Sequence, residues 1–199
     1  MKKELAEMIE RRRSIYDLGA KKVLSEQEIC DIVREAVKYC PTAFNSQSAR
    51  VVVLFDEKHY KFWDIVLQEL KKVASADGFA KTELKIASFA AGYATILFFE
   101  DMETVEGLQK SFPLYAENFG KWSLQANGML EYIIWTALEA GGAGASLQHY
   151  NPLIDAAIKK EWKLPESWML LAQMPVGSVE APAGEKTFLP IDERVKIFK

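Results

Sequence analysis

The run KWSLQANGMLEYIIWTALEAGGAG at residues 121–144 predicts the longest helix of the chain, over Lys121–Ala140. The glycine-rich stretch Gly141–Gly144 ends this helix and begins a tight loop. A helix that is apolar on several faces is typical of the centre of a domain. The residues available for the core are Trp122, Ala126, Met129, Leu130, Ile133, Ala137 and Leu138.

Strands are predicted on both sides of this central helix. Tyr93–Phe99 is almost continuously hydrophobic, which indicates a strand that is buried on both faces. Arg50–Phe55 is a second strand, rich in β-branched residues, and Trp168–Pro175 is a third, buried strand. Because helices separate these strands along the chain, the sequence predicts a layered α/β or α+β sheet.

The remaining helices are predicted from capping residues and apolar spacing. Ser25 and Glu28 form a capping-box signature at the start of a helix that Pro41 ends. Asn151 followed by Pro152 is typical of an N-cap with proline at the first helical position. The expected helices are Lys3–Arg12, the capped helix with its apolar stripe Ile29, Ile32, Val33, Ala36, Val37 and Cys40, Glu57–Ser75 closed by the turn Asp77-Gly78, Lys81–Ser88, Pro152–Trp162, and one or two short ones over Asp101–Gly120.

The length and composition predict one self-sufficient domain. The chain has 199 residues, 49% of them hydrophobic and 27% charged. A domain of roughly 150–200 residues buries about 70% of the surface of its unfolded chain, so its core needs no metal or disulfide. We expect a single domain over residues 1–199, with 181–199 as a C-terminal arm that contains prolines and alternating charges. We hypothesise that this arm packs on a second subunit.

Charge and hydropathy argue against several classes of protein. A net charge of −3 disfavours nucleic-acid binding, because nucleic-acid binders usually carry a basic domain that releases counterions from phosphate. The longest uncharged stretch, Ile86–Phe99, is shorter than the roughly 20 residues of a membrane-spanning helix. The N-terminus carries charges where a signal peptide needs an apolar run. We therefore expect a cytoplasmic protein that binds neither nucleic acid nor a membrane.

Metal and nucleophile chemistry find little support in the sequence. The two histidines, His59 and His149, lie 90 residues apart, so no metal site is expected. Cys30 and Cys40 lie about 15 Å apart along one predicted helix, beyond the ~7 Å limit of a disulfide, and we expect both to be reduced and partly buried. Their position on an apolar helix favours a packing role over nucleophilic catalysis.

The triplet Arg12-Arg13-Ser14 closes the first predicted helix. A bidentate guanidinium beside a hydroxyl donor is chemistry suited to a phosphate monoester. The alternative is a solvated cationic patch that complements the helix dipole.

The loop PTAFNSQS at residues 41–48 places several hydrogen-bonding side chains just before a predicted strand, where α/β proteins often hold ligands. Turn chemistry explains Thr42 and Ser46 equally well, but it explains Gln47 less well. The glycine run at 141–144 is not a dinucleotide loop, because it follows a helix whereas the Rossmann fingerprint follows a strand.

With these segments in this order, the chain resembles the FMN-dependent nitroreductase family over essentially its whole length. The matching features are the helix ending in R-R-S, the loop P-T-A-F-N-S-Q, the long helix leading to G-G-A-G-A, and the short C-terminal arm. The run ASLQHYNPLI at residues 145–154 is similar to the branch that includes fungal fatty-acid-repression proteins and bacterial copper-induced nitroreductases.

The resemblance implies an α+β fold, a three-layer sandwich whose central, mainly antiparallel sheet is flanked by helices. It also implies an intertwined homodimer with FMN at the interface. The triplet at 12–14 would contact the FMN phosphate and ribityl chain, the 45–47 loop of the partner subunit would lie beside the isoalloxazine, and the 147–149 loop would lie near flavin N5. The cofactor-binding residues implied in this way are Arg12, Arg13, Ser14, Asn45, Gln47, Leu147, Gln148, His149, Lys186 and Arg194.

The chain departs from the family pattern at three places. Tyr16 stands where many members have a lysine or arginine facing flavin N1 and O2, and the loss of that cation should lower the flavin potential. His149 stands where larger nitroreductases often have glutamate, and Phe188 replaces a second cation of the arm. Arg194 could compensate for that second cation.

The activity implied is NAD(P)H-dependent flavin oxidoreduction by a ping-pong mechanism, with a nitroaromatic or quinone as acceptor. No protein nucleophile is required, and His149 is the one candidate catalytic residue, as a proton or hydrogen-bond donor near N5. A purely structural hydrogen bond is an equal alternative for this histidine. Phe44 or Tyr115 could line a flat acceptor slot, whereas Trp63, Trp122 and Trp135 are expected to pack.

Two other functions remain open at this point. One is a flavin-binding regulatory or stress-response protein with incidental reductase activity, and the other is a flavin-free interaction domain. The sequence predicts neither the physiological acceptor nor a preference between NADH and NADPH.

Overall fold

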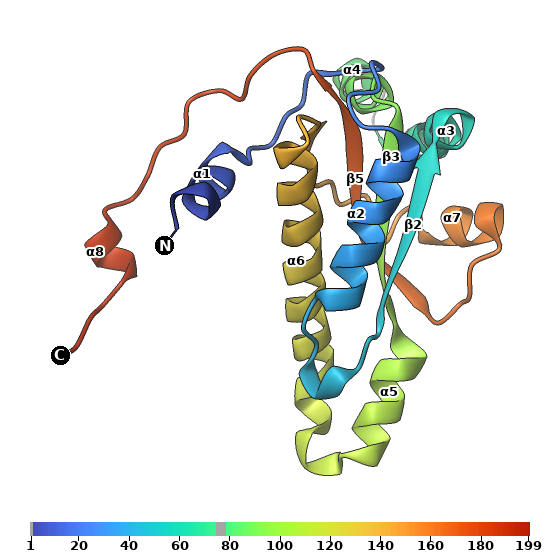
Figure 1. Ribbon diagram of the computed structural model, residues 1–199. Helices are drawn as coiled ribbons and strands as arrows, with labels where there is room; N and C mark the ends of the chain where they lie inside the picture. Colours follow the sequence, from blue (N-terminus) through green and yellow to red (C-terminus); the bar gives the residue numbers. More distant parts are fainter. Residues whose placement is uncertain (1, 75–78) are drawn as a thin grey trace.

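The computed structural model describes residues 2–74 and 79–199, and at its centre lies a five-stranded sheet (Figure 1). β3 (Ala94–Asp101) pairs with β2 (Ala49–Phe55) on one side and with β5 (Trp168–Val179) on the other. The short strands β1 (Leu18–Gly19) and β4 (Gly144–Ala145) also pair with β5. The predicted sheet is therefore confirmed. Because all of these pairings are antiparallel, the fold belongs to the α+β class and not to the α/β class.

β3 is buried on both faces, as its continuous hydrophobicity predicts. Successive side chains of a strand point to opposite faces of the sheet. Ile96 and Phe98 lie in one hydrophobic cluster, whereas Leu97 and Phe99 lie in the other. The sheet therefore separates two cores, and helices cover each of them.

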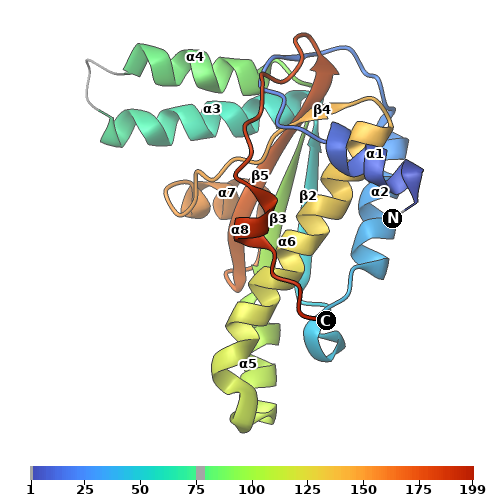
Figure 2. The same ribbon diagram turned by 90° about the vertical axis from the view of Figure 1, so that its left-hand side faces the viewer.

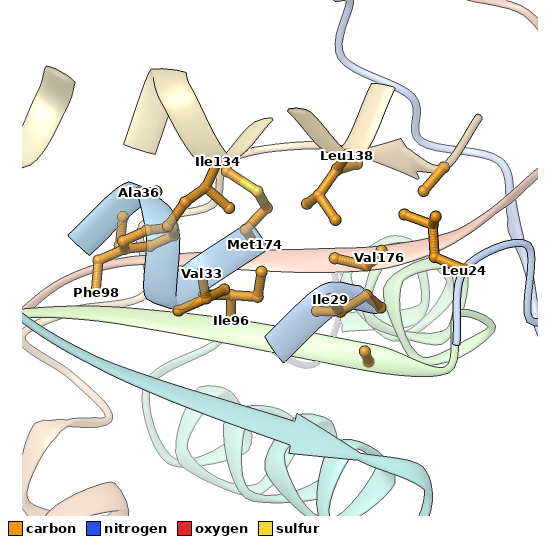
Figure 3. Packing of buried hydrophobic residues seen from close by; sticks show 14 of the residues in the cluster. Leu24, Ile29, Val33, Ala36, Ile96, Phe98, Ile134, Leu138, Met174 and Val176 are labelled. Atoms are coloured by element: carbon orange, nitrogen blue, oxygen red, sulfur yellow. The ribbon is translucent and has the colours of Figure 1, made fainter. Parts of the chain in front are cut away.

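The first core lies under α2 (Glu26–Tyr39) and α6 (Ala116–Ala140) (Figure 3). Ser25 caps α2 with the predicted capping box, in which its hydroxyl accepts from Glu28 N. The buried contributors include Ile29, Val33 and Ala36 from α2, Leu130, Ile134 and Leu138 from α6, and Met174 and Val176 from β5. Two helices thus cover one face of the sheet.

The second core lies under α3 (Asp56–Val73), α4 (Phe79–Ala90) and α7 (Asp155–Trp162). Its buried members include Phe62 and Trp63 from α3 and Phe89 from α4. Figure 2 shows α3 and α4 lying side by side on the face of the sheet opposite α2 and α6. The predicted three-layer sandwich is therefore confirmed.

The segment between β3 and the long helix forms α5 (Met102–Ser111) and the 3-10 turn η3 (Pro113–Tyr115). This confirms the short helices expected over Asp101–Gly120. α6 begins at Ala116, five residues before its predicted start, because η3 leads directly into it. α5 and the first turns of α6 extend beyond the sheet at one end of the molecule (Figure 2).

The predicted helix over Pro152–Trp162 is too long, because α7 begins only at Asp155. The Asn151 side chain does not cap it; its Oδ1 accepts a hydrogen bond of 3.2 Å from Gln173 Nε2 on β5. Residues 151–154 form a turn instead. The prediction that Asn151 caps this helix is therefore wrong, because its side chain pairs with Gln173 instead.

β5 continues four residues beyond the predicted end at Pro175. Its last residues pair with β1, which the sequence did not predict. A side chain at Gly177 would come within 2.6 Å of the Gly19 carbonyl oxygen, so only glycine allows this close strand approach. The Asp77-Gly78 turn lies outside the described residues, and α3 ends at Val73.

Apolar side chains remain exposed on α1 (Lys3–Arg11), α2, α6 and the C-terminal arm. α1 buries none of its residues, and Val37, on the predicted stripe of α2, is also exposed. The arm 181–199 contains only the short helix α8 (Ile191–Arg194) and runs away from the sheet (Figure 1). The exposed apolar side chains of α1, α6 and the arm include Leu5, Ile9, Met129, Tyr132, Ile133, Phe188, Leu189, Ile191, Ile197 and Phe198.

Candidate functional site

A cavity of about 510 Å³ lies between the end of α1 and the start of the C-terminal arm. Arg12, Arg13 and Ser14 line it from one side, and residues 181–186, ending in Lys186, line it from the other. Arg13 Nη2 donates a 2.7 Å hydrogen bond to the Gly184 carbonyl oxygen, 171 residues away in the sequence. The fold therefore brings the cations of the triplet and of the arm to one cavity.

Arg12 is the most constrained of these cations. Its guanidinium carbon lies 4.3 Å from the centre of the Trp135 ring and 5.7 Å from that of Tyr132, both on α6. Its Nε is buried and has no hydrogen-bond partner among the described residues. A buried guanidinium donor without an acceptor is costly, so an anion in the cavity would satisfy it.

The remaining charges of the cavity have mixed signs. Asp17 and Glu185 also line it, so the three cations outnumber the anions by one. Tyr16 lines the cavity too, is 55% exposed, and lies 6.5 Å from the Phe89 ring. Tyr16, which was singled out above for its departure from the family pattern, is therefore at the cavity in the folded chain.

Arg194 is not brought to this cavity. It lies on the exposed helix α8 of the arm, beyond the residues that line the cavity. Lys186 is at the cavity, and its Nζ lies 5.2 Å from the centre of the Phe188 ring. Phe188 thus contacts the cation that it follows by two residues.

The loop at 41–48 has an unusual backbone. It contains the 3-10 turn η1 (Ala43–Asn45), and Phe44, Asn45 and Gln47 all have positive φ angles, of 56°, 52° and 48°. Three non-glycine residues in the left-handed region of one short loop indicate backbone strain, which often accompanies a functional site. The Asn45 and Gln47 side chains are exposed.

Two hydrogen bonds hold this loop in shape. Thr42 Oγ1 accepts from Gln47 N at 3.2 Å, and Arg50 Nη1 donates to Gln47 O at 2.8 Å. These contacts fix the main chain of Gln47 and leave its amide side chain free to meet a ligand.

One chain does not bring this loop to the cationic cavity. The loop follows the C-terminal end of α2, whose 14 residues span about 21 Å. In Figure 1, α1 lies toward one end of the helix pair α2 and α6, and the loop after α2 lies toward the other end. Within one subunit, the loop with Asn45 and Gln47 therefore lies away from the cavity that Arg12 lines.

Segment 146–150 contains the predicted site residues Leu147, Gln148 and His149, and a buried glutamine of β5 holds it in place. Gln173 exchanges two backbone hydrogen bonds with Gln148, of 2.7 and 2.9 Å, and its Oε1 accepts from Tyr150 N at 2.8 Å. The Gln148 side chain is also buried, and its Nε2 donates to Ser146 Oγ at 3.0 Å. Leu147 is half-buried and His149 is exposed.

The sequence reasoning missed Gln173 as a residue of this region. The signal that could have identified it is a single polar residue in the middle of the apolar run MLLAQMPV at 169–176, because a polar side chain buried in a strand needs a hydrogen-bond partner.

An aromatic cluster surrounds Phe44 at the end of the molecule that α5 and α6 form. The Phe44 ring stacks on Trp122, with an interplanar angle of 18°, and its centre lies 4.9 Å from that of Phe112 and 5.8 Å from that of Tyr115. Phe44 is 51% exposed and lines a cavity of about 410 Å³ with Trp122. This cavity has the flat apolar walls that an aromatic ligand requires.

The cysteines do not supply a nucleophile. Both thiols are free, and Cys40 Sγ donates to Ala126 O at 3.5 Å. Burial raises the pKa of the Cys40 thiol, which is opposite to the shift that a reactive thiolate needs. In the described ranges, no group of three or more His, Cys, Asp or Glu side chains could hold a metal ion.

The helices of residues 2–74 and 79–199 include none that is long and apolar enough to cross a membrane.

The chain is thus an α+β protein in which an antiparallel sheet lies between two helical layers, and three cationic side chains line a cavity where the first helix ends. The model of the nitroreductase family matches residues 9–178, and the chain belongs to this family. The predicted family is therefore confirmed.

Relatives of known identity support the predicted branch as well. Nitroreductase CinD from Lactococcus lactis, solved with chloramphenicol, is 47% identical, with 98% of this chain and 100% of that chain covered and a TM-score of 0.90. HBN1 of Saccharomyces cerevisiae is 37% identical over 189 residues, which are 94% of this chain and 93% of HBN1. Nitroreductase FRM2 of the same yeast is 35% identical over 186 residues, 91% of each chain.

Proposed function

We propose that this protein is an FMN-dependent oxidoreductase that takes electrons from NAD(P)H and passes them, by a ping-pong mechanism, to a flat nitroaromatic or quinone acceptor. The observation that carries the proposal is the cavity at which Arg12, Arg13, Ser14 and Lys186 meet, with a buried guanidinium nitrogen that has no acceptor. FMN supplies the hydride chemistry when it is bound.

The residues present fit the phosphate end of FMN. Arg12 and Arg13 would make charge-assisted hydrogen bonds to the phosphate oxygens, Ser14 would donate its hydroxyl, and Lys186 would add a point charge from the arm. The stacking of Arg12 on Trp135 orients its guanidinium before a ligand arrives, which lowers the entropy that binding costs. Arg194 lies outside this set.

We also propose that residues 1–199 form one domain that is complete only as a homodimer. The exposed apolar residues of α1, α6 and the arm offer a large surface for a second copy. A partner subunit would also bring its own Asn45 and Gln47 toward the flavin ring, which the loop of the same chain cannot reach. Each flavin would then lie between two chains.

The segment 146–150 would form the flavin edge of the site. Gln173 and the buried Gln148 hold this segment against β5, so its main chain is rigid. Leu147 and His149 would face the flavin, and the exposed His149 would donate a hydrogen bond or a proton near N5.

The aromatic cluster around Phe44 would hold the acceptor. Phe44 and Tyr115 are both exposed at the surface, where a nitroaromatic or quinone ring could pack against them. CinD has been solved with chloramphenicol and 4-nitrophenol, which both carry a nitrophenyl group, and with nicotinic acid, which carries the pyridine ring of nicotinamide. These ligands of a relative support an acceptor and a donor of the proposed kinds.

Purification and stopped-flow mixing test this proposal. The protein should be yellow, or take up added FMN, and anaerobic NADH or NADPH should bleach the flavin before 4-nitrophenol or a quinone restores its colour. A colourless protein that takes up no FMN would refute the flavoprotein. A bound flavin that neither nucleotide bleaches would favour a flavin-binding regulatory protein.

A further inference from the structure

Glu100 is a fully buried acid near the end of β3. Its side chain is 0% exposed, and that of Asn127, on α6, is 1% exposed. Glu100 Oε1 accepts a hydrogen bond of 3.0 Å from Asn127 Nδ2, which also donates to the Phe99 carbonyl oxygen at 3.1 Å. Both hydrogens of the amide are therefore used.

Two buried acceptors remain in this pair. Glu100 Oε2 and Asn127 Oδ1 are both buried, and neither has a hydrogen-bond partner among the described residues. If Glu100 is a carboxylate, both atoms are acceptors and neither can satisfy the other. A proton on Glu100 Oε2 makes that oxygen a donor, and Asn127 Oδ1 is the unpaired acceptor of the group to which Glu100 is already bonded.

The charges around Glu100 offer no dedicated counter-ion. Among the described residues, the cation that acts on Glu100 is Arg50 on β2, which donates at 2.8 Å to Asp101 Oδ2 and is neutralised by that carboxylate. Asp101 itself repels a negative charge on Glu100, and β5 places Met169 opposite. From α6 comes the neutral Asn127. Burial, the largest influence, raises the pKa of Glu100, while the hydrogen bond from Asn127, the nearby Ser48 hydroxyl and the charge of Arg50 lower it.

Glu100 and Asn127 lie close to Ser48, the last residue of segment 43–48, which is the second part of the loop at 41–48. Ser48 is buried, its carbonyl oxygen accepts from Asp101 N at 3.0 Å, and its hydroxyl lies beside the Glu100 carboxyl group. Ser48 Oγ lies 3.3 Å from Ser46 Oγ, between Asn45 and Gln47 in the sequence. A connected series of polar groups thus runs from α6 through β3 into the loop.

We propose that Glu100 is a neutral carboxylic acid at neutral pH, that it donates its proton to Asn127, and that this pair positions the 43–48 loop. The protonation state is independent of the proposed function. The positioning role rests on the proposed function, because the loop is then the one that lies beside the flavin.

Infrared spectroscopy tests the protonation state directly. The carbonyl stretch of a protonated carboxyl group is separate from the bands of a carboxylate. At neutral pH we expect this band in the wild type and a clear loss of its intensity in Glu100→Gln; burial raises the pKa of Glu131 to about 7, so that acid contributes part of the band. Glu131→Gln is the matched control, because it removes the contribution of this second, half-buried acid and should leave the Glu100 band in place.

Variants test the positioning role. Glutamine at position 100 can accept from Asn127 Nδ2 and donate to Asn127 Oδ1, as the neutral acid does, so Glu100→Gln should keep the wild-type unfolding midpoint and FMN affinity. Asn127→Leu removes the amide at similar volume and should weaken FMN binding by roughly fivefold or more. Glu100→Ala should be impaired in both measurements.

Either of two results would overturn the proposal: a band that Glu100→Gln leaves unchanged, or a Glu100→Gln variant that is as impaired as Glu100→Ala. If the wild type takes up no FMN, the proposed function fails, whereas the infrared band and the unfolding midpoints still test the neutral acid.

Discussion

The Arg12 guanidinium carbon lies 4.3 Å from the centre of the Trp135 ring, so a cation at the end of α1 is held against the long helix α6. Such a contact stabilises a charge without neutralising it, because the ring has no formal charge. Arg12 keeps its ability to bind an anion while its orientation is fixed. The proposed phosphate site therefore depends on α6 as well as on the R-R-S triplet.

Arg12→Ala should weaken FMN binding by about 1.5–3 kcal/mol, or roughly 10- to 150-fold, because it removes a charge-assisted hydrogen bond to the phosphate. The dissociation constant can be measured by quenching of flavin fluorescence. Arg11→Ala is the matched control, since Arg11 pairs with Glu139 at 3.2 Å and does not line the cavity. Equal losses in the two variants would contradict a specific phosphate role.

Tyr16→Arg should raise the two-electron potential of the bound flavin. A cation facing the anionic reduced flavin would stabilise it by about 1.5–3 kcal/mol, which corresponds to roughly 30–65 mV. Redox titration against a dye measures this potential. Tyr60→Arg adds the same charge on α3, away from the cavity that Tyr16 lines, and should leave the potential unchanged.

Ile133→Asp should shift the protein from dimer to monomer, because Ile133 lies on the exposed apolar face of α6 proposed for the second copy. Burying an unpaired carboxylate there would cost several kcal/mol. Sedimentation velocity measures the mass. Leu84→Asp places the same charge at an exposed leucine of α4 in the opposite layer, and a loss of the dimer there would show that the effect is not specific.

Gln173→Leu should destabilise the fold by about 1–3 kcal/mol, because the Tyr150 amide and Asn151 Oδ1 both lose their partner. Urea unfolding measures this loss, and hydrogen exchange of the Tyr150 amide should become faster. Gln27→Leu, on the exposed face of α2, removes only a surface contact with Asp31 and should change stability little. An unchanged exchange rate at Tyr150 would show that Gln173 does not hold the loop.

His59 should make stability depend on pH. The Thr95 hydroxyl accepts from Trp63 Nε1 at 3.0 Å, and the same oxygen lies 2.7 Å from His59 Nδ1, while His59 Nε2 lies 3.2 Å from the Ala90 carbonyl oxygen. Protein groups thus enclose both ring nitrogens in the folded chain. Burial lowers the pKa of His59 below its ordinary value.

The unfolded chain binds a proton at His59 more readily than the folded chain does. Stability from this group is thus fully present above a pH of about 6.5 and is lost as the pH falls below it. The urea midpoint should fall over this range, and His59→Gln should reduce the slope. A His59→Gln variant with the same slope as the wild type would contradict this role of His59.

Local patterns predicted most of the fold correctly. β3 is hydrophobic at nearly every position, and its successive side chains point to opposite faces of the sheet, so each face needs a core. The capping box of α2 appears as expected because it involves residues only three apart. β1 and β4 were missed because two-residue strands have no periodicity of their own. The start of α7 was wrong because Asn151 pairs with Gln173, 22 residues away.

The sequence by itself determined the layers, the family and the chemical groups that a phosphate needs, because hydrophobic periodicity and short motifs are properties of neighbouring residues. Only the tertiary structure decided which of these groups meet. It joined Arg13 to Gly184, left Arg194 outside the cavity and paired Glu100 with Asn127. Such contacts depend on how helices pack across a sheet, and no local pattern encodes a distance between residues far apart in the chain.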